Sequence, residues 1–313
     1  MKVLVTGAGG FVGRELLRQL ASQEGVEVVA LDATLGGVPE HPRLQRVEGD
    51  LGDAAVRAAA VGQGVDALVH LAAVPGGAAE ADPAASRRVN INATFDLFAD
   101  VARSGCRPRV VFASTIAVFG EPLPAAGVDD ATPLAPRLIY GAHKAMAEIE
   151  LATLTRRRAV DGISLRLPGI IARPRGPSGM KSAFMSELFH ALAAGEAFVS
   201  PVSPQASMWL MSVQQVARNL VHGVFVEGDR LPASRACTLP ALQVSWSAMV
   251  DAVRARTGAS ASQVSFVPDA ALEAAFGAYP PLATPAADRA GFSHDGDLAT
   301  LVSRALEGVA TRP

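Results

Sequence analysis

The stretch Thr6-Gly7-Ala8-Gly9-Gly10-Phe11-Val12-Gly13 joins a short apolar run, residues 3–6, to a helical pattern over residues 14–21. A glycine-rich turn between a strand and a helix permits a tight change of direction and lets a ligand approach the backbone closely. The N–H groups of the first helical turn attract a pyrophosphate. We therefore predict that a dinucleotide binds at Gly7, Gly10, Phe11, Val12 and Gly13. The alternative is an ordinary glycine-rich turn.

Apolar runs alternate with helical patterns through the first half of the 313-residue chain. The predicted strands are residues 3–6, 26–31, 44–47, 67–71, 109–113 and 163–167. Such runs are typical of strands buried on both faces, and the intervening helices indicate βαβ units with a parallel sheet. The sequence therefore predicts an α/β fold built on a doubly wound parallel sheet of the Rossmann type.

The second half of the chain has a different character. Pro and Gly residues cluster at 173–179 and again at 279–285, and such clusters mark irregular segments. We expect a dinucleotide-binding domain at 1–172, to which 208–228 returns. We expect a smaller, mainly substrate-binding region at 173–313.

Two carboxylates follow the second and third predicted strands. Asp32 is placed to accept hydrogen bonds from an adenosine ribose and would repel a 2′-phosphate. The next residues, Ala33-Thr34, supply no arginine to receive that phosphate, so NAD is predicted over NADP. An ordinary turn residue is the alternative for Asp32. Asp50, beside Leu51, is predicted to accept from the adenine amino group.

Small residues follow the fourth predicted strand. Ala72 and Ala73 leave room for the dinucleotide along the strand ends, and Leu71 before them is assigned to the same cofactor site. Asn90 lies in a predicted helix, where asparagine is a mediocre helix former, and we assign it to the cofactor site. A solvent-facing Asn90 is the alternative. His70 is assigned to the packing of the strand.

Tyr140 and Lys144 are four residues apart in a predicted helix, so their side chains rise from one face. A positive charge beside a phenol favours the phenolate and brings the pKa of the tyrosine toward neutrality. Ser114 and Thr115 follow the fifth predicted strand, at the sheet edge where α/β folds bind ligands, and the Thr115 hydroxyl can orient a substrate oxygen. These groups predict acid/base chemistry on an alcohol or ketone. Taken alone, the pair also fits a surface tyrosine beside a solvated lysine.

Composition excludes several classes of function. The formal net charge of −2, with acids and bases interspersed, disfavours a nucleic-acid partner. No apolar run approaches the roughly 18 residues of a membrane span, and the N-terminus lacks a signal-peptide pattern. Cys106 and Cys237 lie far apart without metal-ligand neighbours. We predict a cytoplasmic protein without a metal site.

The order of these motifs resembles the extended short-chain dehydrogenase/reductase superfamily, which includes NAD-dependent epimerases and dehydratases. The resemblance covers essentially the whole chain. It implies Tyr140 as catalytic acid/base, Lys144 as the group that lowers its pKa and holds the nicotinamide ribose, and Thr115 as the hydroxyl partner. Asn90 matches the superfamily's Asn-Val-x-Gly-Thr pattern, with Ala93 in place of the glycine. The resemblance also suggests a homodimer formed through helices, including the one that carries Tyr140.

Two departures separate the chain from nucleotide-sugar enzymes of that superfamily. Where those enzymes usually carry Leu-Arg-x-x-Asn, this chain reads Leu165-Arg166-Leu167-Pro168-Gly169, without the asparagine. Where they usually carry an Arg-Asp-Phe-like segment, it reads Met208-Trp209-Leu210. The arginine expected to meet a sugar diphosphate is absent, which disfavours a nucleotide-sugar substrate.

Segments 164–174, 201–204 and 208–212 instead look like the D-erythronate dehydrogenase group. Members of that group oxidise a four-carbon sugar acid at the 2-hydroxyl with NAD. The resemblance therefore predicts NAD-dependent oxidation of a small sugar acid, D-erythronate to 2-oxo-tetronate, with a small molecule as the partner. A nucleotide-sugar 4-epimerase or dehydratase is one alternative, and a non-catalytic NAD-binding regulator is another.

A hydroxy acid needs a positive charge opposite its carboxylate. Arg173 is the first candidate, because a guanidinium can bind a carboxylate through two parallel hydrogen bonds. Ser182, at the start of a helix predicted over 182–194, and Ser114 can add donors, and Trp209 can form a wall of the pocket. The alternatives are a structural salt bridge, a helix cap and a core tryptophan.

Overall fold

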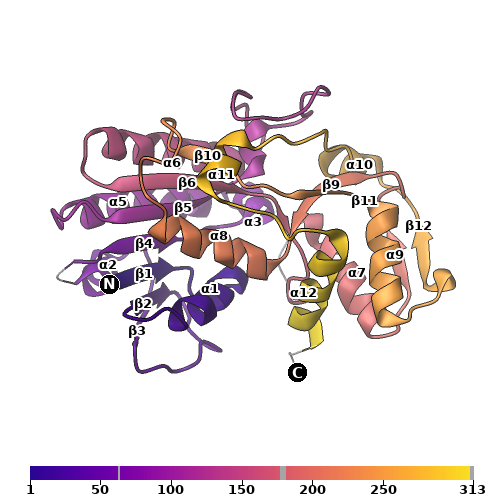
Figure 1. The fold of residues 1–313 in the computed structure, drawn as a ribbon, viewed down its shortest axis with the longest axis horizontal. Helices are drawn as coiled ribbons and strands as arrows, with labels where there is room; N and C mark the ends of the chain where they lie inside the picture. Colours follow the sequence, from indigo (N-terminus) through magenta and orange to yellow (C-terminus); the bar gives the residue numbers. More distant parts are fainter. Residues whose placement is uncertain (63, 177–180, 311–313) are drawn as a thin grey trace.

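A seven-stranded parallel sheet forms the centre of the structure, a computed structural model that describes residues 1–62, 64–176 and 181–310. Every pair of neighbouring strands is parallel. In sheet order the strands are β10 (Ala236–Thr238), β6 (Asp161–Leu167), β5 (Arg109–Thr115), β4 (Ala67–His70), β1 (Lys2–Thr6), β2 (Glu27–Asp32) and β3 (Leu44–Glu48). The predicted doubly wound α/β fold is confirmed, and all six predicted runs are strands (Figure 1).

Helices cover both faces of this sheet (Figure 1). One core cluster joins the sheet to α1 (Phe11–Ala21), α8 (Val213–Phe225) and α11 (Pro285–Ala290). A second cluster joins the opposite face to α2 (Ala54–Val61), α5 (Thr94–Ala102) and α6 (Ile139–Arg156). Since successive strand residues point to opposite faces, Val3 and Val5 enter the first cluster and Leu4 the second. Burial on both faces explains why these strands are continuously apolar.

The strand order reverses between β1 and β4. Chain segments leaving these two strands at their carboxyl ends diverge, and open α/β sheets bind ligands in the crevice that results. The turn after β1 holds Gly7, and the segment after β4 holds Ala72 and Ala73. That segment leads into α3 (Gly76–Ala81), α4 (Pro83–Arg87) and the π-helical turn η1 (Arg88–Ala93), whereas β5 leads into the 3₁₀ turn η2 (Ile116–Phe119).

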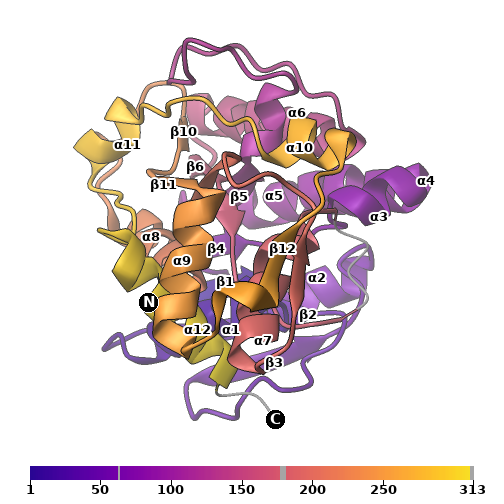
Figure 2. The same ribbon diagram turned by 90° about the vertical axis from the view of Figure 1, so that its right-hand side faces the viewer.

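A smaller region packs beside the carboxyl edge of the sheet and faces the viewer in Figure 2. It has its own core, which includes Phe189 and Trp246. Its strands are β7 (Gly169–Ile170), β9 (Ser207–Met211) and β11 (Leu242–Ser245) in one sheet, and β8 (Phe198–Ser200) and β12 (Val264–Phe266) in another. Its helices are α7 (Phe184–Ala193), α9 (Trp246–Thr257), α10 (Ala270–Phe276) and α12 (Leu298–Ala310), with the 3₁₀ turns η3 (Lys181–Ala183) and η4 (Ala261–Gln263).

The chain passes between the two regions repeatedly. Helices α8 and α11 pack on the central sheet, and β10 forms one edge strand of it. The sequence did not place β10 and α11 there. The helix predicted over 182–194 begins with η3 and continues as α7. Part of the irregular segment predicted at 173–179 lies outside the described residues.

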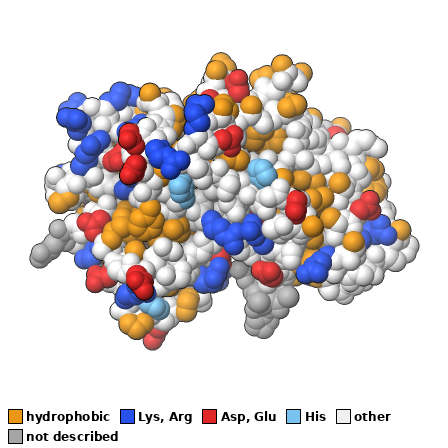
Figure 3. All heavy atoms as spheres, in the orientation of Figure 1, with side chains coloured by type: hydrophobic (Ala, Val, Ile, Leu, Met, Phe, Trp, Pro, Cys, Tyr) orange, Lys and Arg blue, Asp and Glu red, His pale blue; other side chains and the backbone are white. Residues whose placement is uncertain are grey.

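Charged side chains of both signs are interspersed on the face drawn in Figure 3, between scattered apolar groups. Among the described helices, none combines the length and the apolar character that crossing a bilayer requires. In the same part of the chain, no group of three or more His, Cys, Asp or Glu side chains is arranged to hold a metal ion.

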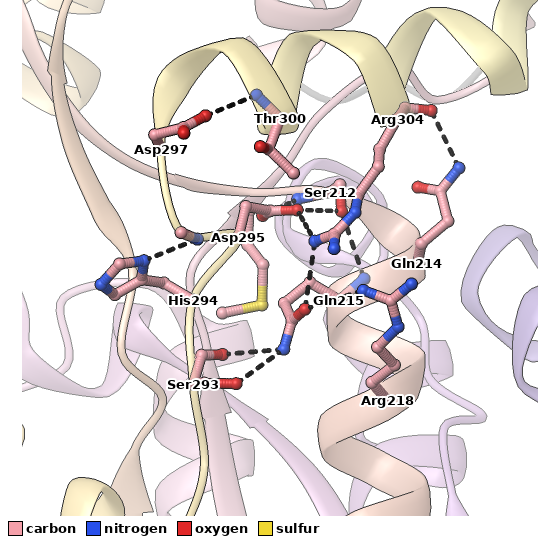
Figure 4. Close-up of polar contacts among 12 residues, drawn as sticks. Ser212, Gln214, Gln215, Arg218, Ser293, His294, Asp295, Asp297, Thr300 and Arg304 are labelled. Atoms are coloured by element: carbon pink, nitrogen blue, oxygen red, sulfur yellow. Dashed lines mark hydrogen bonds and ion pairs between the residues drawn. The ribbon is translucent and has the colours of Figure 1, made fainter.

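A buried polar network ties the C-terminal segment to the start of α8 (Figure 4). Asp295, which is 4% exposed, accepts from the backbone N–H of Ser212 at 2.9 Å and from its hydroxyl at 2.6 Å. Arg304 of α12 donates to the same carboxylate at 2.7 Å. Gln215 and Asn219 of α8 donate to the Ser293 carbonyl. These bonds fix α12 against α8 and so hold the smaller region on the sheet.

We expect Asp295→Ala to lower the free energy of unfolding by about 3 kcal/mol, because it leaves a buried N–H, a hydroxyl and a guanidinium without their acceptor. Denaturant titration measures the change. Asp297→Ala is the matched control, since Asp297 caps α12 at the surface through the Thr300 N–H, and its loss should be clearly smaller. Equal losses in the two variants would contradict this role for Asp295.

Candidate active site

The glycine turn after β1 is packed too closely for side chains. Gly7 has φ of +69°, and a Cβ there would lie 2.7 Å from the Ala72 nitrogen. A Cβ on Gly13 would lie 2.1 Å from the Gly7 carbonyl oxygen, and one on Gly9 would lie 2.3 Å from the Thr34 oxygen. Gly9 was not among the predicted positions. The turn thus brings α1 directly against the end of β1 and beside the segment after β4.

The groups around this turn fit a dinucleotide. Gly10 precedes the first residue of α1 and provides no side-chain cap, and the first turn of α1 has no acidic residue. No side chain of the first turn therefore neutralises the positive end of the helix dipole, and this end can attract a phosphate. The Asp32 carboxylate accepts from the Gly9 N–H at 2.9 Å, which holds it at the edge of the turn where a ribose would lie.

The other predicted cofactor residues have varied surroundings. Asp50 is half-exposed, accepts from the Gly52 N–H at 2.8 Å and pairs with Arg88 at 2.7 Å. These two bonds, the backbone one first, hold the pKa of Asp50 below its ordinary value. Leu51 is buried in the core, and Leu71, Ala72 and Ala73 are partly exposed beyond β4. A contact between Asp50 and adenine stays a prediction.

Asn90 acts on the segment after β4. It lies on the π-helical turn η1 and is 2% exposed, so the solvent-facing alternative is wrong. Its carboxamide accepts from the Val74 N–H at 2.8 Å and donates to the Val74 oxygen at 2.9 Å and to Ser86 at 3.1 Å. Ser86 in turn shares a hydrogen bond with His143 of α6. Asn90 therefore positions the segment that carries Ala72 and Ala73.

A cavity of about 1100 Å³ opens between the carboxyl edge of the sheet and the smaller region. Among the predicted site residues, those that line it are Thr115, Tyr140, Arg173, Ser182 and Trp209. Two of the three predicted catalytic residues, Thr115 and Tyr140, therefore share one cavity with most of the predicted substrate-binding groups, whereas Lys144 is not among the residues that line it.

Ser114 is the exception among the predicted substrate-binding residues. Its side chain is 2% exposed and donates to Glu148 of α6, which also forms an ion pair with Arg166 at 2.7 Å. Because strand residues alternate between faces, Ser114 points into the α6 packing while its neighbour Thr115 reaches the cavity. The Thr115 hydroxyl oxygen accepts from the Ala117 N–H at 3.2 Å, which orients it at the end of β5.

Lys144 is fixed one helical turn from Tyr140. Its ammonium donates to the Ala113 oxygen at 2.8 Å and lies 4.5 Å from the Phe112 ring centroid and 5.8 Å from that of Tyr140. Burial lowers the pKa of Lys144 to about 7, while the Glu148 carboxylate acts in the opposite direction.

His70 packs behind this lysine. It is fully buried, and its two ring nitrogens form hydrogen bonds with Thr6 and Thr94. Burial, and then the charge of Lys144, lower the pKa of His70 to about 3. The ring therefore stays neutral, and His70 belongs to the core of the sheet, as the sequence indicated.

The electrostatics of Tyr140 differ from the expectation. Burial raises the pKa of Tyr140 above its ordinary value, and the charge that opposes this effect is the Arg173 guanidinium. The Lys144 ammonium donates to the Ala113 oxygen, and the expected effect of its charge on the phenol stays a prediction. The positive charge that favours the Tyr140 phenolate in the structure is therefore that of Arg173.

Arg173 is held by two backbone contacts and one side-chain contact. Its N–H donates to Ser186 at 3.1 Å, its carbonyl lies 2.6 Å from the His190 ring, and its Nε donates to the Ile170 oxygen at 3.2 Å. Ala172, immediately before it, is buried with φ of +56°, a left-handed conformation that a non-glycine residue adopts only when its surroundings enforce it. The packing of α7 thus determines where Arg173 enters the cavity.

Trp209 and Ser182 both lie at the wall of the cavity. Trp209 is fully buried, its indole N–H donates to the Pro280 oxygen at 2.8 Å, and it also lines the cavity, so it is both a core and a wall residue. Ser182 lies in η3 at the cavity wall. Sequence reasoning missed Tyr279, which packs on Trp209 and lines the same cavity. The signal was available, because the chain has only two tyrosines and the other is Tyr140.

Comparison with known proteins gives the following similarities. The profile of the NAD dependent epimerase/dehydratase family matches residues 3–222. A D-erythronate dehydrogenase of Cupriavidus necator is 36% identical, with 98% of each chain covered. One of Haemophilus influenzae is 32% identical, with 80% of each chain covered. The crystal structure of a nucleoside-diphosphate-sugar epimerase from Agrobacterium tumefaciens superposes with a TM-score of 0.88, at 29% identity, covering 98% of this chain and 94% of that one.

The buried ammonium predicts a pH dependence of stability. Burial lowers the pKa of Lys144 to about 7, whereas an unfolded lysine titrates near about 10.4. Between these values the unfolded chain binds more protons than the folded one, so the contribution of Lys144 to the free energy of unfolding rises with pH, by up to about 1.4 kcal/mol per unit. Denaturant titrations from about pH 6 to about pH 9 should therefore show native stability rising relative to Lys144→Met.

The exposed Lys181→Met serves as the matched control and should follow the native pH dependence. A native and a Lys144→Met curve that stay parallel over this pH range would contradict the altered pKa.

Proposed function

The chain belongs to the NAD-dependent epimerase/dehydratase family, and on that basis we propose that it oxidises the 2-hydroxyl of a small sugar acid, with D-erythronate as the preferred substrate. The superfamily indicated by the sequence motifs is confirmed, and the chain is an NAD-dependent oxidoreductase. The names of the two similar dehydrogenases support the choice of substrate.

One observation carries the proposal: the half-buried Arg173 side chain lines the same cavity as Tyr140, and its positive charge opposes the rise in the pKa of that phenol. An arginine stays charged in proteins, so a cavity that contains one favours an anionic ligand. A carboxylate bound to Arg173 would hold the adjacent C2 hydroxyl close to Tyr140. A 2-hydroxy acid therefore fits this site better than a neutral alcohol.

The proposed roles combine what the family resemblance implies with the positions of the side chains. When bound, NAD accepts the hydride from C2. Thr115 orients the C2 hydroxyl, and Tyr140 accepts its proton at the phenolate oxygen. Lys144 holds the nicotinamide ribose and adds positive charge beside the phenol. Arg173 keeps the carboxylate in place and favours the phenolate.

A nucleotide-sugar 4-epimerase or dehydratase is the second candidate. The cavity volume of about 1100 Å³ favours it, because a four-carbon acid leaves much of that space unfilled. The motif departures at Pro168-Gly169 and Met208-Trp209 speak against it. Conversion of a UDP- or dTDP-sugar by purified protein with retained NAD would establish this candidate instead.

We also propose a homodimer through α6. Met146 and Ile149 are 49% and 62% exposed on that helix, which supports an apolar contact with a second copy. A cytoplasmic location stays a prediction.

The proposed reaction predicts that one stereoisomer of erythronate or threonate reduces NAD. The nicotinamide absorbance measures this reduction. Tyr140→Phe should lower kcat by about 10²–10⁴-fold, because the proton acceptor is lost, and it should still bind NADH. Full turnover by Tyr140→Phe would rule out the mechanism. Absence of reduction with all stereoisomers, together with nucleotide-sugar conversion, would favour the second candidate.

The position of Asp32 predicts the choice of cofactor. We expect native protein to bind NADH more tightly than NADPH, and Asp32→Asn to narrow the difference by about tenfold or more, since the repulsion of a 2′-phosphate is removed. The asparagine keeps an acceptor for the Gly9 N–H, so the turn is preserved. Fluorescence titration with NADH and NADPH measures the ratio without requiring a substrate. Equal binding of both by the native protein would contradict the role of Asp32.

A further inference from the structure

The cavity contains a second phenol that the proposed reaction does not use. Tyr279 lines the cavity together with Tyr140, and these are the two tyrosines of the chain. Its ring meets Trp209 edge to face, with ring centroids 4.9 Å apart. Trp209 is itself fixed by the bond from its indole N–H to the Pro280 oxygen. The aromatic contact therefore sets the direction of the Tyr279 ring.

The backbone around Tyr279 is held at both ends. The Tyr279 N–H donates to the Ser207 oxygen at 3.0 Å, and Gln243 donates to the Tyr279 oxygen at 3.1 Å. Further along, Val128 exchanges hydrogen bonds with Pro281 and Ala283. This segment, although rich in proline and without regular structure, is thus a fixed wall between β9 and the loop after η2.

The hydroxyl of Tyr279 is open to the cavity. It forms no hydrogen bond within the part of the chain that the structure describes, and it is not among the buried polar atoms that lack a partner. Solvent therefore reaches the oxygen, and the side chain lines the cavity. Burial, and then the Glu121 carboxylate, raise the pKa of Tyr279, so the phenol is a hydrogen-bond donor at neutral pH.

Arg173 and Tyr279 enter the cavity from different ends of β9. The Arg173 guanidinium donates to Ile170, whose partner in the sheet is Met211 at the end of β9. Tyr279 is bonded to Ser207 at its start. The backbone anchors of the two side chains are therefore about 13 Å apart along five extended residues, and each side chain reaches from its anchor into the shared cavity. The charges near the two phenols differ as well. The Arg173 guanidinium lowers the pKa of Tyr140, whereas the Glu121 carboxylate raises the pKa of Tyr279.

From this polarity we infer that Tyr279 and Glu121 form a subsite for the uncharged hydroxyl end of the substrate, opposite the carboxylate site at Arg173. The phenol donates to the terminal hydroxyl oxygen, and the Glu121 carboxylate can accept from the same hydroxyl. Its negative charge disfavours a second carboxylate at this end. The inference rests on the proposed function and extends it: the substrate is a monocarboxylic polyol acid, and a dicarboxylic acid of the same length is excluded.

Three acids test the subsite: D-erythronate, 2,3-dihydroxybutanoate of matching stereochemistry, which lacks the terminal hydroxyl, and tartrate, which has a carboxylate there. Tyr279→Phe keeps the ring on Trp209 and should lower kcat/KM for erythronate by about tenfold while leaving that for 2,3-dihydroxybutanoate within about twofold. Glu121→Gln should raise kcat/KM for tartrate relative to erythronate by about tenfold. Tyr140→Phe is the matched control and should lower turnover of every acid.

Equal loss on erythronate and 2,3-dihydroxybutanoate, or no loss on either, would overturn the subsite. Calorimetry can measure the binding of the same acids in the presence of NADH. This measurement distinguishes failure of the subsite from failure of the proposed function. If native protein oxidises none of the acids but binds erythronate about tenfold more tightly than 2,3-dihydroxybutanoate, and Tyr279→Phe removes that difference, the subsite stands and the reaction is wrong. If neither acid binds, both are wrong.

Discussion

The ion pair between Glu148 and Arg166 determines where α6 sits, and α6 carries the proposed catalytic tyrosine and lysine. Arg166 of β6 donates to both oxygens of the carboxylate, at 3.0 Å and 2.7 Å, and Ser114 of β5 donates to one of them. Both charged side chains are almost completely buried. Removing two charges from water is unfavourable unless the geometry satisfies their hydrogen bonds, so this pair tolerates only one placement of the helix over the two strands.

Two glycines, one in α6 and one in β6, make that placement possible. A Cβ on Gly141 would lie 2.4 Å from the Ala117 oxygen, and one on Gly162 of β6 would lie 2.6 Å from the Leu151 side chain. The helix therefore approaches η2 at its start and β6 further along, with Glu148 bonded between these two contacts. Tyr140, Lys144 and Glu148 follow one another at four-residue spacing, so fixing the rotation of the helix at Glu148 also fixes the direction of the other two.

The sequence predicted the groups that depend on local pattern and missed those that depend on packing. The glycine turn, Asp32 and the Tyr140–Lys144 spacing are short-range signals, and the continuously apolar strands indicate a sheet covered on both faces. Ser114 was placed in the cavity because it adjoins Thr115, but one residue along a strand reverses the face. The return of β10 and α11 to the sheet depends on long-range contacts such as the pairing of Cys237 with Leu165, which no local motif encodes. For the same reason the partnership of Trp209 with Tyr279, seventy residues apart, was not predictable from either segment.

Burial around the phenol explains why the site needs more than one cation. Tyr140 and Lys144 are both placed where desolvation favours their neutral forms, which raises the pKa of the phenol and lowers that of the ammonium. Arg173 can maintain its charge in such surroundings because a guanidinium does not lose its proton in proteins. The Glu148 carboxylate, one turn beyond Lys144, favours the charged ammonium from the other side. A substrate carboxylate at Arg173 would neutralise part of the positive charge that favours the phenolate, so the protonated Lys144 becomes more important once the anion is bound. In the proposed reaction the two cations would therefore not be redundant: Arg173 would attract the acid, and Lys144 would support the phenolate after Arg173 has been paired.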